Sequence, residues 1–151
     1  MPTVVDTLDD LASLVGQPLE PSTWVEVDQQ RIDAFAGATG DHQWIHTDPA
    51  RAKDGPFGGT IAHGYLTLSL LIPMWTEILD VREVTTKVNY GLNKVRFPAP
   101  VPAGSKLRAT ATLTAVDPVP GGAQLTADIT IEIEGAAKPA CVAQLLFRFM
   151  H

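Results

Sequence analysis

The chain has very little cysteine: Cys141 is the only one among its 151 residues. A single cysteine excludes an internal disulfide, so the fold must rely on a hydrophobic core. A chain of this length can bury a sufficient core without a covalent cross-link. Cys141 lies in an apolar segment, which is typical of a buried, unreactive thiol rather than of a nucleophile. A lone reduced thiol suits a reducing compartment, and we expect the protein to be cytoplasmic.

Long apolar runs and positive charge are also scarce. The apolar stretch 65–75 is too short to span a bilayer, and residues 1–10 lack the basic start and apolar core of a signal peptide. The 11 Lys and Arg residues against 17 Asp and Glu residues give a net charge of −6, which argues against bulk electrostatic binding of nucleic acid. We therefore expect no membrane and no nucleic acid among the partners. The length and composition suit a single domain over residues 1–151.

The hydrophobic pattern changes its period near residue 80. Before that point it predicts helices and a short strand: helices over 6–15, 29–38 and 63–79, a strand over 23–27 and a capped helical turn over 48–52. After that point it predicts four strands, over 82–97, 106–116, 125–134 and 139–149. The helix 63–79 is apolar on every side and must be buried, and Pro73 predicts a kink near Ser69. Because consecutive strands can pair antiparallel, we expect an α+β fold with a curved antiparallel sheet around one apolar helix.

Residues 40–49 concentrate an acid, two imidazoles and an amide. Asp41 and His46 can share one water molecule, which the carboxylate orients and the imidazole deprotonates or protonates near neutral pH. Gln43 stands between them and offers both a donor and an acceptor to orient either group. Spacing alone leaves an alternative open, in which Asp41 caps a turn and His46 is a packing residue.

The start of the long helix is the second candidate feature. The first backbone amides of a helix lack partners and carry partial positive charge, and a glycine there lets a carbonyl approach closely. Gly64 therefore offers an oxyanion site, with close packing against the sheet as the alternative. For the neighbouring His63, a capping or packing role is the favoured interpretation.

Metal binding and nucleophilic catalysis fit this sequence less well. His42 and His46 stand four residues apart, as metal ligands on one helix face can, and Asp48 lies nearby. No glutamate lies between the two histidines and a glycine precedes them, so we expect no metal site. Ser69 lies inside the apolar helix without a nucleophile elbow, which is typical of a serine bonded to its own helix backbone.

Taken together, these motifs resemble a known family. The pattern Gly40-Asp41-x-Gln43-x-x-His46, the later stretch 61–64 with its apolar helix, and the strand and turn at 95–104 are similar to the MaoC-like (R)-specific enoyl-CoA hydratases, also called hydratase 2. Relatives of nodulation protein N share the signature. The resemblance covers residues 25–149. It implies a hot-dog fold, in which a long antiparallel sheet wraps one central helix, and a homodimer whose sheets join edge to edge.

The resemblance also implies an activity, namely reversible hydration of trans-2-enoyl-CoA to (R)-3-hydroxyacyl-CoA. Carried over by position, the catalytic pair falls on Asp41 and His46 and the oxyanion amide on Gly64. Gln43 stands where the family has an asparagine, and Trp44 stands where it usually has a proline. Coenzyme A belongs to the substrate, so no separate cofactor is implied. The implied partners are the acyl-CoA substrate and a second copy of the chain.

Three other functions stay open at this point. A 3-hydroxyacyl dehydratase acting on acyl carrier protein would use the same residues to catalyse the reverse reaction. Its acidic carrier protein would need a basic docking patch, which a net charge of −6 does not indicate. A thioesterase on the same fold matches the Asp41–His46 pair less well. A non-catalytic acyl-CoA-binding module remains an alternative because Gln43 and Trp44 depart from the family pattern.

Overall fold

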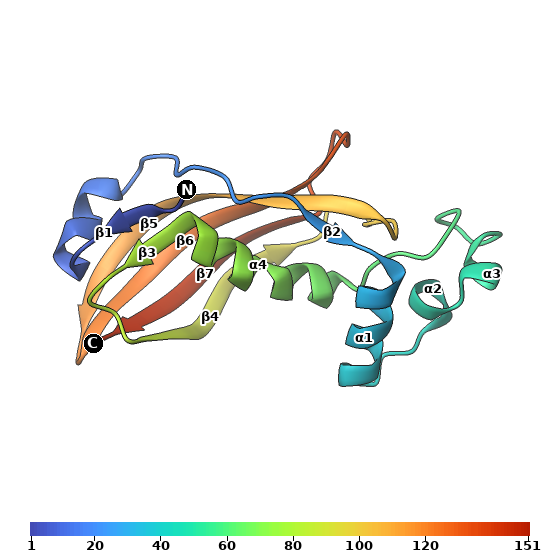
Figure 1. Cartoon of the computed structure of the whole chain (residues 1–151), viewed down its shortest axis with the longest axis horizontal. Coiled ribbons are helices and arrows are strands. Elements are labelled where there is room, and N and C mark those ends of the chain that lie inside the picture. Colours follow the sequence, from blue (N-terminus) through green and yellow to red (C-terminus); the bar gives the residue numbers. More distant parts are fainter.

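The apolar helix expected at the centre of the molecule is α4 (Gly64–Ile78) in a computed structural model that describes residues 1–151. It lies along a curled antiparallel sheet (Figure 1). The sheet has the spatial order β2-β5-β6-β7-β4, and its strands are β2 (Val25–Val27), β5 (Ser105–Val119), β6 (Gly122–Ile133), β7 (Cys141–Met150) and β4 (Thr86–Arg96). The hot-dog fold predicted from the sequence is confirmed.

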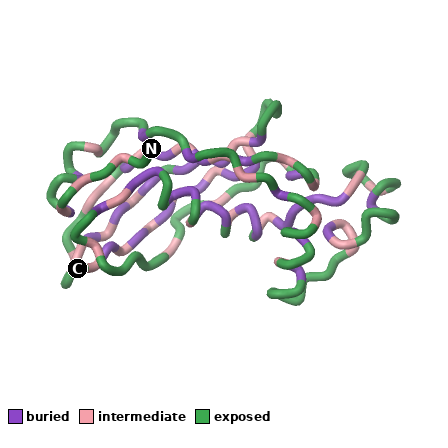
Figure 2. The backbone as a smooth tube through the Cα atoms, viewed as in Figure 1, coloured by how far each residue is buried: buried purple, intermediate pink, exposed green.

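The core lies between α4 and the inner face of the sheet. Side chains of β5, β6 and β7 alternate between buried and partly exposed along most of each strand, as strands covered on one face do. Trp75 of α4 stacks on Phe147 of β7 with ring centroids 4.9 Å apart and an interplanar angle of 12°. Burying each such large side chain contributes roughly 1.5–3 kcal/mol. Figure 2 shows the buried trace running along α4 and the central strands.

The remaining elements lie at the two ends of this core. At one end are β1 (Thr3–Val5), the 3₁₀ helix η1 (Leu8–Leu14) and β3 (Leu79–Val81), and β1 pairs with β3 in parallel. At the other end, beside the first turn of α4, are α1 (Gln29–Thr39), α2 (Trp44–Thr47) and α3 (Pro49–Ala52) (Figure 1). None of the helices combines the length and apolar character needed to cross a membrane.

Strand pairing differs from the expected consecutive order at one place. β4 pairs with β7 and not with β5, its successor in the chain. The proline-rich connection after β4 makes no hairpin, because its backbone bonds to other segments. Ala99 N–H donates to Pro139 O at 3.1 Å, and Ala103 N–H donates to Thr60 O at 2.9 Å. The connection therefore carries the chain past the start of α4 before β5 begins.

The structure also differs from the predicted elements in smaller ways. The segment predicted as an amphipathic helix over 6–15 is the 3₁₀ helix η1. The turn expected from Pro118 begins later, because β5 runs to Val119. β2 pairs only with residues 105–107, so β5 is an edge at Pro118 and the missing N–H costs no ladder bond there. α4 is continuous through Pro73, and the expected backbone bond of Ser69 is present, from Oγ to Tyr65 O at 2.7 Å.

Candidate active site

Asp41, His46 and Gly64 line one cavity of about 250 Å³. They come from three different elements: the turn after α1, the helix α2 and the first residue of α4. The other lining residues are Phe35, Thr39, His63, Tyr65 and Phe97. The structure thus brings together the carboxylate, the imidazole and the helix-start amide on which the sequence-based hypothesis depends.

The ends of α1 determine where Asp41 lies. Asp28 caps the start of the helix, accepting from Arg31 N–H at 2.8 Å. The helix ends at Gly40, whose φ of 80° is left-handed and whose N–H donates to Ala36 O at 2.9 Å. Because a glycine adopts this conformation without strain, the chain turns sharply there and Asp41 follows at the rim of the cavity.

Asp41 is exposed, and the hydrogen bonds of its carboxylate and of its N–H are local. Its Oδ1 accepts from Gln43 N–H at 3.4 Å, and its own N–H donates to Thr39 Oγ1 at 3.4 Å. Its carbonyl oxygen accepts from His63 Nε2 at 3.0 Å. The carboxylate therefore keeps most of its acceptor capacity free for a water molecule in the cavity.

His46 is 7% exposed and has a defined proton arrangement. Its Nδ1 lies 2.7 Å from Ile61 O. A carbonyl can only accept, so in the neutral ring the proton is assigned to Nδ1 and the lone pair to Nε2. Ile61 N–H in turn donates to Ile45 O at 3.0 Å, which ties the segment before α4 to α2. His46 is thus an oriented imidazole with its basic nitrogen unoccupied.

Gly64 supplies an amide at the start of the helix. The first hydrogen bonds of α4 run from Leu66 and Thr67 N–H to His63 O, so the N–H of Gly64 has no acceptor within the helix. A Cβ at Gly64 would lie 3.3 Å from the Phe97 ring, so the ring would have to give by a few tenths of an ångström. Close packing therefore favours a glycine at this position, and its unbonded N–H leaves room for an approaching carbonyl.

A second, mainly apolar cavity of about 380 Å³ adjoins the first and shares Gly64 and Phe97 with it. Its other lining residues are Phe57, Ile61, Ala62, Thr67, Ala99, Pro100, Val101 and Ala140. An apolar chain attached to a group held at Gly64 would find room there.

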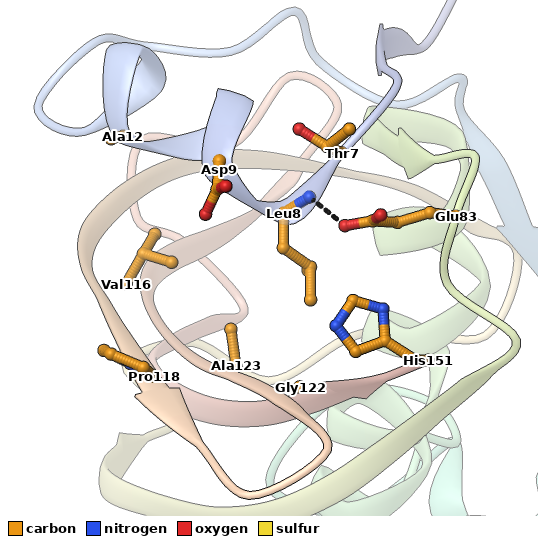
Figure 3. Close-up of a pocket in the computed structure, with 10 residues that line it drawn as sticks. All are labelled: Thr7, Leu8, Asp9, Ala12, Glu83, Val116, Pro118, Gly122, Ala123 and His151. Carbon is orange, nitrogen blue, oxygen red and sulfur yellow. Dashed lines mark hydrogen bonds between the residues drawn. The ribbon is translucent and has the colours of Figure 1, made fainter.

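A further cavity of about 350 Å³ lies at the opposite end of the molecule, between η1 and the turn that joins β5 to β6 (Figure 3). It contains Asp9, Glu83 and His151, and Glu83 Oε1 accepts from Leu8 N–H at 2.6 Å. None of the candidate site residues lies there.

The comparison with known families agrees with this geometry. Residues 10–132 match the family described as MaoC like domain. The chain belongs to the MaoC-like family.

Curated relatives of this MaoC-like chain span nearly its whole length. It is 51% identical over 146 residues to 3-hydroxyacyl-thioester dehydratase Z of Mycobacterium tuberculosis, covering 96% of this chain and 97% of the relative. It is 48% identical over 141 residues to nodulation protein N of Rhizobium leguminosarum bv. viciae, covering 91% and 87%. Among solved structures, the MaoC-like dehydratase from Rhodospirillum rubrum superposes with a TM-score of 0.77 at 25% identity, covering 96% of this chain and 97% of that one.

The two departures from the expected MaoC-like pattern now have structural descriptions. The side chain of Gln43 is exposed, makes no hydrogen bond and does not line the cavity, so only its backbone N–H contacts Asp41. Trp44 lies under the Arg51 guanidinium, 4.2 Å from the ring centroid, and packs against Gly55, where an added Cβ would be 3.0 Å from the indole. Trp44 therefore anchors the loop after α3 where a proline would only have stiffened a turn.

The residues of this MaoC-like chain that could hold a metal ion differ from the pair considered in the sequence, His42 and His46. His42 is exposed and does not join His46. Asp41, His46 and His63 instead offer ligand atoms within 4.8 Å of one another and are the residues that could hold a metal ion. Each imidazole already bonds a backbone carbonyl through one nitrogen, so only His46 Nε2 and His63 Nδ1 are unoccupied.

Two residues that support the site were not foreseen from the sequence. Gln29 Nε2 donates to His46 O at 2.7 Å, and Thr60 Oγ1 donates to Gln29 Oε1. These bonds link α1, α2 and the segment before α4 across 17 and 31 residues of sequence. Gln29 lies on the first turn of an ordinary amphipathic helix, and nothing in the local pattern distinguishes it from its neighbour Gln30.

Proposed function

We propose that this MaoC-like protein is a hydro-lyase that interconverts trans-2-enoyl-CoA and (R)-3-hydroxyacyl-CoA. The observation that carries the proposal is the convergence of three groups on one cavity: the exposed carboxylate of Asp41, the free Nε2 of buried His46 and the helix-start amide of Gly64. These are the water-orienting group, the proton carrier and the oxyanion donor that addition of water to a conjugated thioester needs.

In the hydration direction, Asp41 and His46 hold one water molecule. His46 Nε2 takes a proton from the water as its oxygen bonds to C3 and the C2=C3 double bond opens. Negative charge builds on the thioester oxygen, where the Gly64 N–H donates a hydrogen bond. The proton then passes from the pair to C2 on the same face, so one water molecule is added across the double bond. Dehydration follows the same steps in reverse.

Within this mechanism the adjoining apolar cavity receives the acyl chain. It shares Gly64 and Phe97 with the catalytic cavity, so a thioester carbonyl at Gly64 has apolar space directly beside it. No separate cofactor takes part, because coenzyme A is a portion of the substrate.

A dehydratase acting on acyl carrier protein is the second candidate. The 51% identical relative is named for dehydration of a 3-hydroxyacyl thioester, which does not specify the carrier. An acidic protein carrier needs a basic docking patch, which the net charge of −6 does not indicate.

We further propose that the active form is a homodimer joined along β4. This strand is an edge of the sheet and presents the exposed apolar side chains Val88, Tyr90 and Leu92. A long edge of this kind is an open template for pairing, and a second copy of the chain would cover it. Register shifts after Asn89 and Leu92 restrict which partner strand can pair there.

The test of substrate class compares crotonyl-CoA with crotonyl-acyl carrier protein at equal concentration, following the enoyl absorbance and free thiol. Faster loss of absorbance with crotonyl-CoA, without thiol release, supports the proposal. Faster turnover of the carrier-protein thioester would assign the dehydratase instead, and thiol release would indicate a thioesterase. Saturable binding without turnover of either thioester would indicate a non-catalytic acyl-CoA-binding module.

A further inference from the structure

We propose that His63 is a positioning residue, which holds Asp41 and His46 in register with the amide of Gly64. Its sequence context suggested only a capping or packing histidine. The kinetic part of the inference rests on the proposed function, whereas its structural part concerns the ring of His46 and can be measured without any substrate.

The ring of His63 lies directly against the ring of His46. The two centroids are 3.9 Å apart and the rings are inclined by only 24°, so they are stacked. His63 is 3% exposed, and Phe35 contacts it with centroids 4.8 Å apart. Because His46 is fixed at Nδ1 by Ile61 O, the stack restricts the remaining rotation of its ring and therefore the direction in which Nε2 points.

The same ring holds the backbone of Asp41. His63 Nε2 lies 3.0 Å from Asp41 O, and since a carbonyl only accepts, His63 donates this bond. This hydrogen bond fixes the backbone of Asp41, which lies 22 positions before His63 in the sequence. In the neutral ring, Nδ1 then keeps a lone pair, and this atom is buried with no hydrogen-bond partner.

An unpartnered buried nitrogen is not what simple packing requires. Buried polar atoms are nearly always paired, and an apolar ring of the same size would fill this space without leaving one. His63 also does not cap its helix through its side chain. The two features that distinguish a histidine here from a phenylalanine are the bond to Asp41 and the free Nδ1.

The backbone of His63 completes the connection. His63 is the N-cap of α4, with φ −60° and ψ 139°, and its carbonyl accepts from Leu66 and Thr67 N–H. Its conformation therefore determines where the next amide, that of Gly64, points. One residue thus contacts the water-orienting acid, the proton carrier and the oxyanion donor, and a displacement of about 1 Å at such groups costs about 10²-fold in rate.

The experiment uses two variants of His63 and a matched control in the full-length protein. His63→Phe keeps a stacked ring and removes the donor. His63→Gln removes the ring and keeps an amide donor with a reach similar to that of Nε2. His42→Phe is the control, because His42 is an exposed histidine next to Asp41 and its side chain makes no hydrogen bond.

We expect His63→Phe to lower kcat for crotonyl-CoA about 10–100-fold with KM within about threefold, and His63→Gln to recover at least about fivefold of the loss. His42→Phe should match the wild type. Nitrogen-15 NMR of the imidazoles should report the Nδ1–H form of His46 in the wild type and in His63→Phe, which keeps the stack, and an averaged signal in His63→Gln, which loses it. A merely structural role would lower thermal stability without moving the His46 signal or separating kcat from KM.

Several results would overturn the inference. They are a kcat of folded His63→Phe within twofold of the wild type, an unchanged His46 signal in His63→Gln, or equal losses in both variants. If His63→Phe does not fold, His63→Gln provides the test. A kcat of His63→Gln equal to that of the wild type would show that the His63 ring does not position His46. A wild-type protein that turns over no enoyl thioester contradicts the proposed function instead, and the NMR comparison still tests the inference.

Discussion

Asp41 and His46 have opposite surroundings, and this contrast assigns their roles. The carboxylate is exposed and accepts only from the nearby Gln43 N–H, so its remaining lone pairs can hold a water molecule. The imidazole is buried and oriented by Ile61, so its free Nε2 meets only what enters the cavity. The acid–base pair is therefore asymmetric before any substrate binds.

At Gly64, an alanine should disturb the oxyanion amide through Phe97. The added methyl group would lie 3.3 Å from that ring, so either the ring or the first turn of α4 must move. We expect Gly64→Ala to lower kcat by up to about 10²-fold, the size of effect seen when an oxyanion donor is lost. Steady-state kinetics of Gly64→Ala with and without Phe97→Leu test the cause. The second substitution should restore part of the rate, and no restoration would contradict the Phe97 contact as the cause.

At Cys141, burial raises the pKa of the thiol from 9.0 to about 11. The unfolded chain releases this proton near pH 9 and the folded chain near pH 11, so between these values the unfolded state binds fewer protons. Stability is therefore unaffected below pH 9 and falls as pH rises toward 11. Urea unfolding at pH 8, 9, 10 and 11 should show a steeper loss for the wild type than for Cys141→Ala. Parallel curves for the two proteins would contradict a buried thiol.

At the scale of elements, Gln29 links the helices α1 and α2 and the segment before α4. The helices α1 and α2 share few apolar side chains with the main core, which consists of α4, the sheet and the N-terminal segments. Polar bonds that cross between segments therefore matter more here than in the sheet. Gln29 bonds both the carbonyl of His46 and the hydroxyl of Thr60, so it holds the backbone of His46, a cavity-lining residue, against the segment before α4.

Removing the Gln29 amide should destabilise this end of the molecule. Gln29→Ala leaves Thr60 Oγ1 and His46 O without their partner, and an unsatisfied part-buried group costs about 1–3 kcal/mol. Gln30→Ala is the matched control, because Gln30 is exposed on the same helix. Urea unfolding should separate the two variants by about 1 kcal/mol or more. Equal stabilities would show that the Gln29 bonds contribute nothing net.

How far each element could be predicted depends on the strength of its periodic pattern. α4 and the long strands were predicted because an all-round apolar helix and an alternating strand give strong, different signals over ten or more residues. The three-residue strands β1 and β3 give no such signal, and α2 is a single turn. The pairing of β4 with β7 depends on where residues 97–104 find hydrogen bonds, which is a tertiary property.

The residues of the candidate site also differ in how far the sequence could predict them. Asp41 and His46 lie within one short segment, so their proximity followed from the sequence. Gly64 could be joined to them only through the resemblance to a family. The bonds of Gln29 and the stack of His63 on His46 join residues 17 or 31 positions apart, too far for any local pattern to show them.

At the scale of the whole molecule, one edge of the sheet is left open. The other edge strand, β2, is only three residues long, whereas β4 has eleven residues, nearly all exposed. A charge placed in β4 should therefore prevent pairing with a second copy. We expect Leu92→Glu to be monomeric, and light scattering after size exclusion to give half the mass of the wild type.

The control for this prediction is Val4→Glu. Val4 has the same 44% exposure as Leu92 but lies on β1, in the separate two-stranded sheet. It should leave the wild-type mass unchanged. A wild-type protein that elutes as a monomer would contradict the homodimer directly, and a dimeric Leu92→Glu would move the interface away from β4.

The central claim, that Asp41 and His46 activate water for addition to an enoyl thioester, has one direct test. Crotonyl-CoA is mixed with the wild type, Asp41→Asn and His46→Gln, and the absorbance of the conjugated thioester is followed. We expect the wild type to consume it with formation of the (R)-3-hydroxyacyl product, and each variant to be slower by about 10²–10⁴-fold. Equal rates for all three proteins would contradict the assignment of the catalytic pair.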